Sequence, residues 1–120
     1  MEFQNHSYNL HTTNNGRNGS MKKRNESLEE YSKVLKADLG KLQEKFQENC
    51  NYTPNTYTYP FGAISYVSTD ILKEMGFKAS LSCWAGTSYI TKDPECLYML
   101  KRYNREGRFT TENFFKKILN

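Results

Sequence analysis

The sequence predicts an α/β fold in which parallel strands alternate with helices. Apolar residues recur every three or four positions across residues 27–50, the spacing of a helix that packs one face on a core. Short segments with strand propensity lie on either side of a second, shorter helical pattern. Strands that alternate with helices pair in parallel, and 120 residues are enough for one such domain and not for two.

The chain begins with an extended segment and a polar loop. Residues 2–5 are interpreted as the end of a strand that leads into His6-Ser7-Tyr8-Asn9-Leu10-His11. Residues 12–26 contain four Asn and two Gly, which favours a flexible polar loop.

A long helix is expected after this loop. Ser27 and Glu30 fit a capping box, in which each side chain satisfies a free backbone N–H of the other residue. The helix is expected to end near Cys50. Its apolar stripe consists of Leu28, Tyr31, Val34, Leu35, Leu39, Leu42 and Phe46.

The middle of the chain predicts a strand, a turn and a second helix. Residues 56–60 (Thr-Tyr-Thr-Tyr-Pro) have strong strand propensity, and Pro60-Phe61-Gly62 forces a turn. A helix is expected over residues 65–75, with Gly76 in the left-handed position just past its end. The inward-facing positions of this helix are Val67, Ile71, Leu72 and Met75.

The last third predicts two strands and a helix. Residues 77–84 are interpreted as a buried strand that Ala85-Gly86-Thr87 ends, and residues 96–102 as another strand. A final helix is expected to begin at Thr110 or Thr111. Its apolar residues are Phe114, Phe115, Ile118 and Leu119.

The charge distribution bears on possible partners. The net charge is +4 at pH 7. A basic cluster consists of Arg17, Lys22, Lys23 and Arg24. No aromatic residue interleaves with this cluster, so we expect a solvated, mobile loop there and no nucleic-acid partner. No segment has the length of a membrane span or the pattern of a signal peptide, and the sequence leaves the localisation open.

The three cysteines are Cys50, Cys83 and Cys96. Their odd number and wide spacing fit neither a disulfide framework nor a zinc knuckle, so reduced or buried thiols are expected.

Both histidines of the chain, His6 and His11, lie in one loop, where two imidazoles five positions apart can reach one ion. Imidazole suits zinc, and a catalytic zinc usually has three protein ligands and an open position for water. The alternative is a pair of solvent-facing histidines on a polar loop. The third ligand is expected before Met1, because the three aspartates lie in helices or a turn. These are Asp38, Asp70 and Asp93.

Three segments with notable chemistry each follow a predicted strand. They are His6–His11, Tyr59–Gly62 and Cys83–Gly86. In βα proteins the functional site lies at the carboxyl ends of the strands, so we expect these segments to converge on one site.

The same segments resemble motifs of the polysaccharide deacetylase family, the NodB-homology enzymes. Residues 2–11 resemble the motif in which His-Ser/Thr-x-x-x-His follows a short strand end. Tyr59-Pro60-Phe61-Gly62 resembles a later motif of the form Tyr-Pro-Tyr/Phe-Gly, and residues 71–78 match the helix-to-strand passage that follows it. The resemblance covers nearly the whole chain and implies a partial (β/α) barrel, as one incomplete deacetylase domain over residues 1–120.

The resemblance implies a hydrolase that removes N- or O-acetyl groups from a sugar polymer, acting on carbon–nitrogen bonds other than peptide bonds in the first case. A divalent metal, zinc or a similar ion, would polarise the carbonyl and activate water. His6 and His11 inherit the role of metal ligands. Tyr59 and Pro60 belong to the substrate-binding turn, and the backbone N–H of Phe61 inherits the contact with the acetyl oxygen.

The sequence departs from the family pattern at three points. The Thr-Phe-Asp-Asp-Gly motif, which supplies the general base and the third ligand, is absent, so the base is expected upstream of Met1. Thr58 replaces an arginine near the motif proline. Arg102 stands where a late Leu-x-His motif has the acid, and it is expected to bind an oxyanion or a sugar hydroxyl. The resemblance implies that Trp84 lines the acetate pocket, and the alternative is a tryptophan of the core.

Because the family barrel needs more chain, the first strand is expected to have an open edge, which favours a homo-oligomer or a domain-swapped assembly. The isolated chain is then expected to have little or no activity. Two other functions stay open. One is a non-catalytic relative that binds an acetylated glycan through aromatic side chains, and the weaker one is a basic interaction module at Arg17–Arg24. The aromatic residues are Tyr57, Tyr59, Trp84 and Tyr89.

Overall fold

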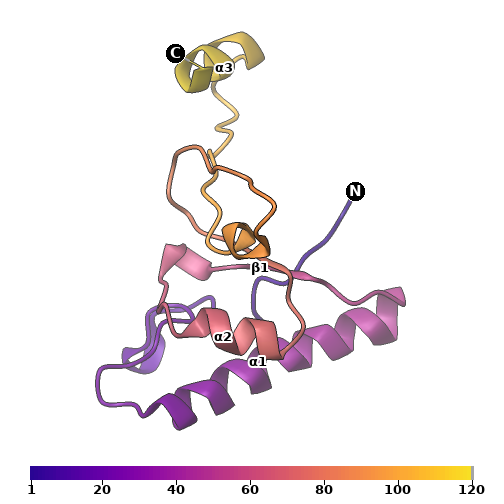
Figure 1. Cartoon of the computed structure of the whole chain (residues 1–120), viewed down its shortest axis with the longest axis vertical. Coiled ribbons are helices and arrows are strands. Elements are labelled where there is room, and N and C mark those ends of the chain that lie inside the picture. Colours follow the sequence, from indigo (N-terminus) through magenta and orange to yellow (C-terminus); the bar gives the residue numbers. More distant parts are fainter. Residues whose placement is uncertain (120) are drawn as a thin grey trace.

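A computed structural model describes residues 1–119 of the chain (Figure 1). The first helix, α1 (Leu28–Cys50), has the capping box expected from the sequence. The Ser27 hydroxyl accepts from the N–H of Glu30 at 3.1 Å, and the Glu30 carboxylate accepts from the N–H of Ser27 at 2.9 Å. Asn51, in the left-handed conformation, ends the helix one residue after Cys50.

The strands are parallel, as predicted, but shorter than expected. β1 (Thr56–Thr58) pairs with β2 (Ala79–Leu81) in parallel. Isolated parallel bridges extend this pairing on both sides, from Asn5 to Tyr57 and from Leu100 to Leu81. Four extended segments therefore lie side by side in the order in which they occur along the chain, and their carboxyl ends share one edge.

The predicted strands at residues 2–5 and 96–102 are wrong in extent, since each contributes one bridge. Asn5 pairs with β1 through two backbone hydrogen bonds, to Thr56 and from Thr58. Before this bridge the side chain of Gln4 accepts from the N–H groups of Asn55 and Thr56, both at 3.0 Å, where a longer strand would pair through its backbone. At the other edge, residues 94–97 form a turn of 3-10 helix, η3 (Pro94–Leu97), and Met99 has a φ of 59°, which interrupts an extended backbone.

The core lies between the strands and the helices α1 and α2 (Ser68–Glu74). Helix α2 begins later than predicted, so Val67 is 40% exposed instead of facing inward. Gly76 has a φ of 88°, as its expected left-handed position requires. The core cluster consists of Tyr31, Leu35, Leu39, Tyr57, Tyr59, Ile71, Leu72 and Phe77.

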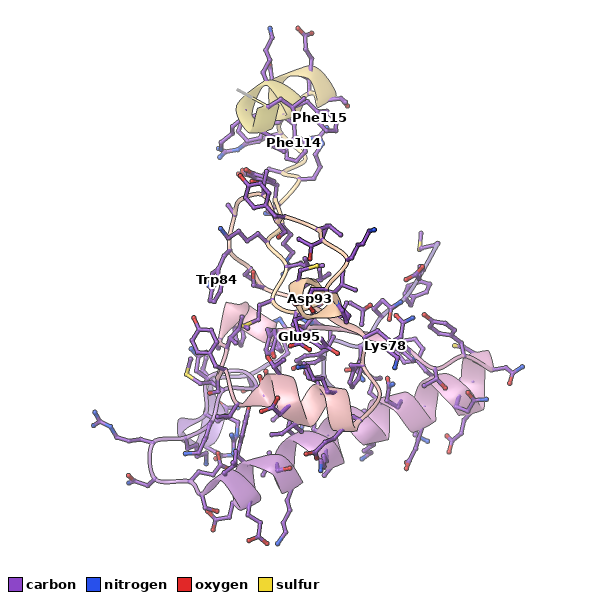
Figure 2. The ribbon with its side chains drawn as sticks, viewed as in Figure 1. Lys78, Trp84, Asp93, Glu95, Phe114 and Phe115 are labelled. Carbon is purple, nitrogen blue, oxygen red and sulfur yellow. The ribbon has the colours of Figure 1, made fainter. Side chains whose placement is uncertain are left out.

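The last helix, α3 (Thr111–Leu119), begins where the sequence predicts and lies apart from the other helices (Figure 1). The hydroxyl of Thr110 accepts from the N–H of Asn113 at 3.2 Å, as a capping residue does. Phe114 and Phe115 lie on this distant helix (Figure 2), and Phe115 is 49% exposed.

The polar loop at residues 12–26, which includes η1 (Asn14–Gly16), makes buried contacts with the rest of the protein. Arg17 is buried instead of solvated, because its guanidinium pairs with the carboxylate of Glu26 and donates to the carbonyl oxygen of Met21 at 2.9 Å. Arg17 is therefore not one of the solvent-exposed positive charges that the sequence predicts for the basic cluster.

All three cysteines are free thiols. The alternative that they are buried is wrong for Cys50 and Cys83, which are exposed, and Cys96 is half-buried. Among the described residues, no helix combines the length and the apolar character needed to cross a bilayer.

Candidate functional site

The structure brings His6, His11 and Phe61 together at the carboxyl edge of the parallel strands. His6 directly follows the bridge at Asn5, and Phe61 lies in the turn after β1, η2 (Pro60–Gly62). The imidazole centroids are 4.9 Å apart, and the centroid of His11 lies 4.3 Å from that of Phe61. The histidine loop and the Phe61 turn therefore meet through side-chain contact, and Cys83 of the third segment lies against the same turn, with its sulfur 3.8 Å from the carbonyl oxygen of Tyr59.

The ring of His6 has a defined tautomer. Its Nδ1 lies 2.7 Å from the carbonyl oxygen of Thr58. A carbonyl oxygen only accepts hydrogen bonds, so Nδ1 carries the proton in neutral His6, and Nε2 keeps its lone pair. His6 is half-buried and His11 is exposed, so a small ligand can reach the pair from solvent.

The turn that presents Phe61 has an unusual backbone. Phe61 has a φ of 59° and Gly62 a φ of 63°, both in the left-handed region. That conformation costs a non-glycine residue about 1–2 kcal/mol. The turn directs the aromatic ring of Phe61 to His11 and leaves the side chain 49% exposed.

Two residues expected to contact the substrate are in the core instead. Tyr59 is fully buried, and its hydroxyl donates to the hydroxyl of Ser68 at 2.6 Å, since Ser68 in turn donates to Ser65. Pro60 is also buried. Burial raises the pKa of Tyr59, so this phenol stays protonated. Their side chains position the turn and offer no surface to a ligand.

Arg102 lies beside Cys83 on the same carboxyl edge. Its Nε donates to the carbonyl oxygen of Ser82 at 2.6 Å, and its Nη2 lies 2.9 Å from the sulfur of Cys83. Cys83 in turn faces Gly62 of the turn, where an added Cβ would lie 2.9 Å from the Cys83 Cβ. These contacts fix the guanidinium next to the turn that carries Phe61.

Trp84 is 43% exposed and points away from the strands (Figure 2). Tyr89 is 88% exposed, whereas Tyr57 is fully buried. Of the four aromatic residues suggested as a glycan surface, only Trp84 and Tyr89 are therefore accessible.

Sequence reasoning missed the residues that hold the histidine loop. Asp38, which the sequence suggests is a helix-surface residue, accepts from the N–H groups of Tyr8 and Asn9, both at 2.8 Å. Asn5 is fully buried and accepts from the N–H of Ser7 at 2.9 Å. The one sequence signal for Asn5 is an amide side chain directly before the first histidine, at the end of an extended segment.

Within residues 1–119, no three side chains of His, Cys, Asp or Glu lie close enough together to hold a metal ion. The two imidazoles thus form an incomplete ligand set among the described residues. A four-coordinate zinc needs further ligands beside them.

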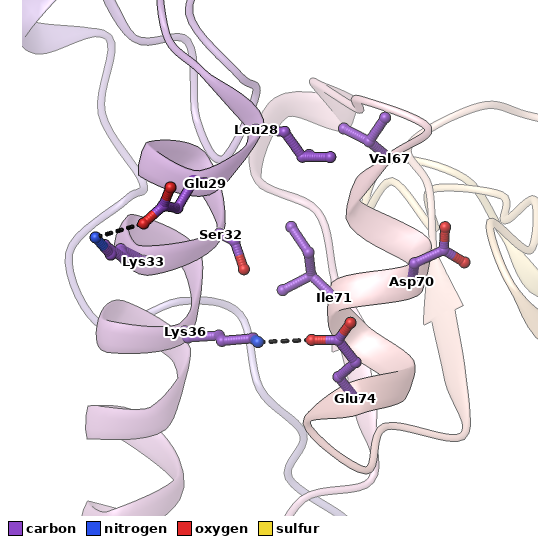
Figure 3. Close-up of a pocket in the computed structure, with 9 residues that line it drawn as sticks. All are labelled: Leu28, Glu29, Ser32, Lys33, Lys36, Val67, Asp70, Ile71 and Glu74. Carbon is purple, nitrogen blue, oxygen red and sulfur yellow. Dashed lines mark hydrogen bonds and ion pairs between the residues drawn. The ribbon is translucent and has the colours of Figure 1, made fainter.

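A separate groove of about 730 Å³ lies between α1 and α2 (Figure 3). Four of its five charged side chains form ion pairs, Lys33 with Glu29 at 2.9 Å and Lys36 with Glu74 at 2.6 Å. It contains no histidine or cysteine, so its chemistry does not match that of the histidine site. Its lining consists of Leu28, Glu29, Ser32, Lys33, Lys36, Val67, Asp70, Ile71 and Glu74.

The fold and the site together define an α/β protein with two histidines at the carboxyl edge of parallel strands. The polysaccharide deacetylase family matches residues 1–80, which is two thirds of the sequence, and the chain belongs to this NodB-type family.

Two solved structures share the fold. A de-N-acetylase from Aggregatibacter actinomycetemcomitans is 19% identical, with a TM-score of 0.72 over 96% of this chain and 47% of that one. The deacetylase domain of BpsB from Bordetella bronchiseptica is 20% identical, with a TM-score of 0.67 over 84% and 42% of the two chains. The chain thus spans less than half the length of either structure. No curated protein sequence matches the chain.

Proposed function

We propose that this chain forms the metal-ligand and acetyl-binding part of a polysaccharide deacetylase, which hydrolyses N- or O-acetyl groups of a sugar polymer. The observation that carries the proposal is the contact of His6, His11 and Phe61 at the carboxyl edge of the strands. The two solved relatives are described as a de-N-acetylase and a deacetylase, which supports the same reaction class. In this proposal the parallel strands are part of a (β/α) barrel.

The residues present fit a divalent metal with a preference for nitrogen ligands, such as zinc. The hydrogen bond to Thr58 leaves Nε2 of His6 with its lone pair, and the ring of His11 lies 4.9 Å from that of His6. When bound, the metal would polarise the acetyl carbonyl and lower the pKa of a water molecule.

The other side chains have positioning and binding roles in this proposal. The backbone N–H of Phe61 would donate to the acetyl oxygen, and Tyr59 and Pro60 would fix the turn from within the core. Arg102 would bind a sugar hydroxyl or an oxyanion, since a guanidinium does not release a proton near neutral pH. Trp84, which is 43% exposed, would contact the substrate in this proposal, by stacking on a sugar ring or by lining the acetate pocket (Figure 2).

The general base and the third ligand are not among the motifs of these 120 residues, and we propose that another segment or chain supplies them. The isolated chain is then inactive or weakly active. Association with a second copy, by pairing of an open strand edge or by domain swapping, is one way to complete the site.

Zinc titration by calorimetry tests the proposal, with the wild-type chain and the variants H6A and H11A. We expect one zinc per chain in the wild type and at least a tenfold loss of affinity in each variant, because each removes one of two nitrogen ligands. Equal zinc affinity in the wild type and both variants would contradict it.

The second candidate function is a non-catalytic glycan-binding protein, and the exposed rings of Trp84 and Tyr89 favour it. Trp84 is the single tryptophan of the chain, so its fluorescence reports this region alone. An acetylated chito-oligosaccharide should change the fluorescence only with zinc present if the chain is part of a deacetylase. A zinc-independent change that W84A abolishes and H6A preserves would favour the binding protein.

A further inference from the structure

The loop between the two histidines is held by a single carboxylate on α1. The two oxygens of Asp38 accept separately from consecutive backbone amides, Oδ1 from Tyr8 and Oδ2 from Asn9, each at 2.8 Å. Hydrogen bonds to an ionised acceptor are about twice as strong as neutral ones. One half-buried side chain therefore fixes the middle of the loop against the helix.

A second anchor lies at the start of the loop. The buried side-chain amide of Asn5 donates to the carbonyl oxygen of Leu39 at 3.1 Å and to Gln43 at 3.0 Å, and it accepts from the N–H of Ser7. Ser7 has a φ of 74°, so the backbone turns sharply directly after His6. Asn5 binds the carbonyl oxygen of Leu39, and Asp38 is the residue before Leu39. Both anchors therefore dock the loop on the same turn of α1.

We infer that Asp38 is a positioning residue, which sets the separation of His6 and His11 through the loop backbone. Both carboxylate oxygens of Asp38 already accept from N–H groups of the loop, so we assign Asp38 no coordinating role. Without it, the backbone from Ser7 to His11 loses two of its contacts with α1, and the ring of His11 is free to leave that of His6. This inference rests on the metal site proposed above.

Two variants that each remove one negative charge from α1 separate position from charge. In D38N, an NH₂ group replaces one carboxylate oxygen and faces a backbone N–H, so one hydrogen bond is lost and two donors oppose each other. Glu44 lies exposed on the same helix, and E44Q is the matched control. D38S removes the charge without placing an NH₂ group against a backbone N–H, and it replaces D38N in the test if D38N does not fold.

We expect zinc affinity, measured by calorimetry, to fall about 10- to 100-fold in D38N, which is the usual effect of removing a partner that orients a metal ligand. E44Q should bind zinc like the wild type. Amide hydrogen exchange should show faster exchange at Tyr8 and Asn9 in D38N, at an unchanged global unfolding midpoint. Wild-type zinc affinity in folded D38N or D38S would overturn the inference.

Failure of the metal site itself has a different signature. If the wild-type chain binds no zinc, the site under the proposed function is refuted, while the position of the rings is still measurable by NMR. A nuclear Overhauser effect between the ring protons of His6 and His11 that is present in the wild type and lost in D38N supports the positioning role. The same signal in both proteins, or in neither, overturns it.

Discussion

Nδ1 of His6 donates to the carbonyl oxygen of Thr58, the last residue of β1, at 2.7 Å. This bond connects the loop at the start of the chain to the strand that leads into the Phe61 turn. It fixes both the tautomer and the orientation of the ring, so the two halves of the candidate site depend on each other.

The left-handed backbone at Phe61 predicts an inverted order of two variants. Alanine is usually more stable than glycine in a folded chain, by about 0.5–1 kcal/mol in regular elements. At a φ of 59° the Cβ is unfavourable, so F61G should be more stable to urea than F61A, by about 1 kcal/mol. Both variants lose the contact with His11, so the comparison isolates the backbone. F61A at least as stable as F61G would show that the turn is not strained.

Substitution by alanine should change the free energy of unfolding in opposite directions at Gly62 and Gly40. At Gly62 a Cβ would lie 2.9 Å from the Cβ of Cys83 with a φ of 63°, so G62A should lower the free energy of unfolding by about 1–3 kcal/mol. At Gly40, inside α1, a Cβ meets nothing within 4 Å, so G40A should raise it by about 0.5–1 kcal/mol. Urea denaturation of the two variants measures both values.

Substitution of Tyr59 should affect stability and not ligand binding. Y59F removes the buried hydrogen bond to Ser68, which contributes about 1 kcal/mol. Zinc affinity should stay at the wild-type value, since the ring is fully buried. A loss of zinc or glycan affinity without a loss of stability would show instead that Tyr59 takes part in ligand binding.

The buried ion pair of Arg17 and Glu26 predicts a pH dependence of stability. The hydrogen bond from Arg17 holds the pKa of Glu26 below its ordinary value of 4.5. Because the folded pKa is the lower one, the stabilisation is complete above the unfolded pKa and is lost as pH falls through the folded value.

The difference in unfolding free energy between the wild type and E26Q should therefore be largest near neutral pH, at about 3 kcal/mol, and shrink as the pH falls below 4.5 and the Glu26 carboxylate is protonated. The double variant R17M/E26Q lacks both charges and provides the control. A difference that stays constant across this range would contradict the assignment.

Local rules predicted the elements whose signals lie within a few residues. The capping box of Ser27 and Glu30 placed the start of α1, and Gly76 marked the end of α2. The rule that carboxyl ends of parallel strands share an edge predicted the meeting of the histidine loop with the Phe61 turn.

The rest depended on contacts between distant segments. The side chain of Gln4 continues, beyond the backbone bonds of Asn5, the pairing with the segment before β1, and strand propensity does not predict such a contact. The role of Asp38 requires the loop and α1 to be docked. The burial of Tyr59 had an available signal: residues two apart in a strand share a face, so Tyr59 follows Tyr57 into the core.

The histidine loop takes its shape from positions far along the chain. Its anchors at Asp38 and Thr58 lie 29 to 52 residues away from the groups they hold. A synthetic peptide with the sequence of residues 6–11 has both imidazoles but none of these anchors, and it must lose backbone entropy before they can share an ion. The pair is thus a product of tertiary folding, and an ion that binds it raises the melting temperature of the chain.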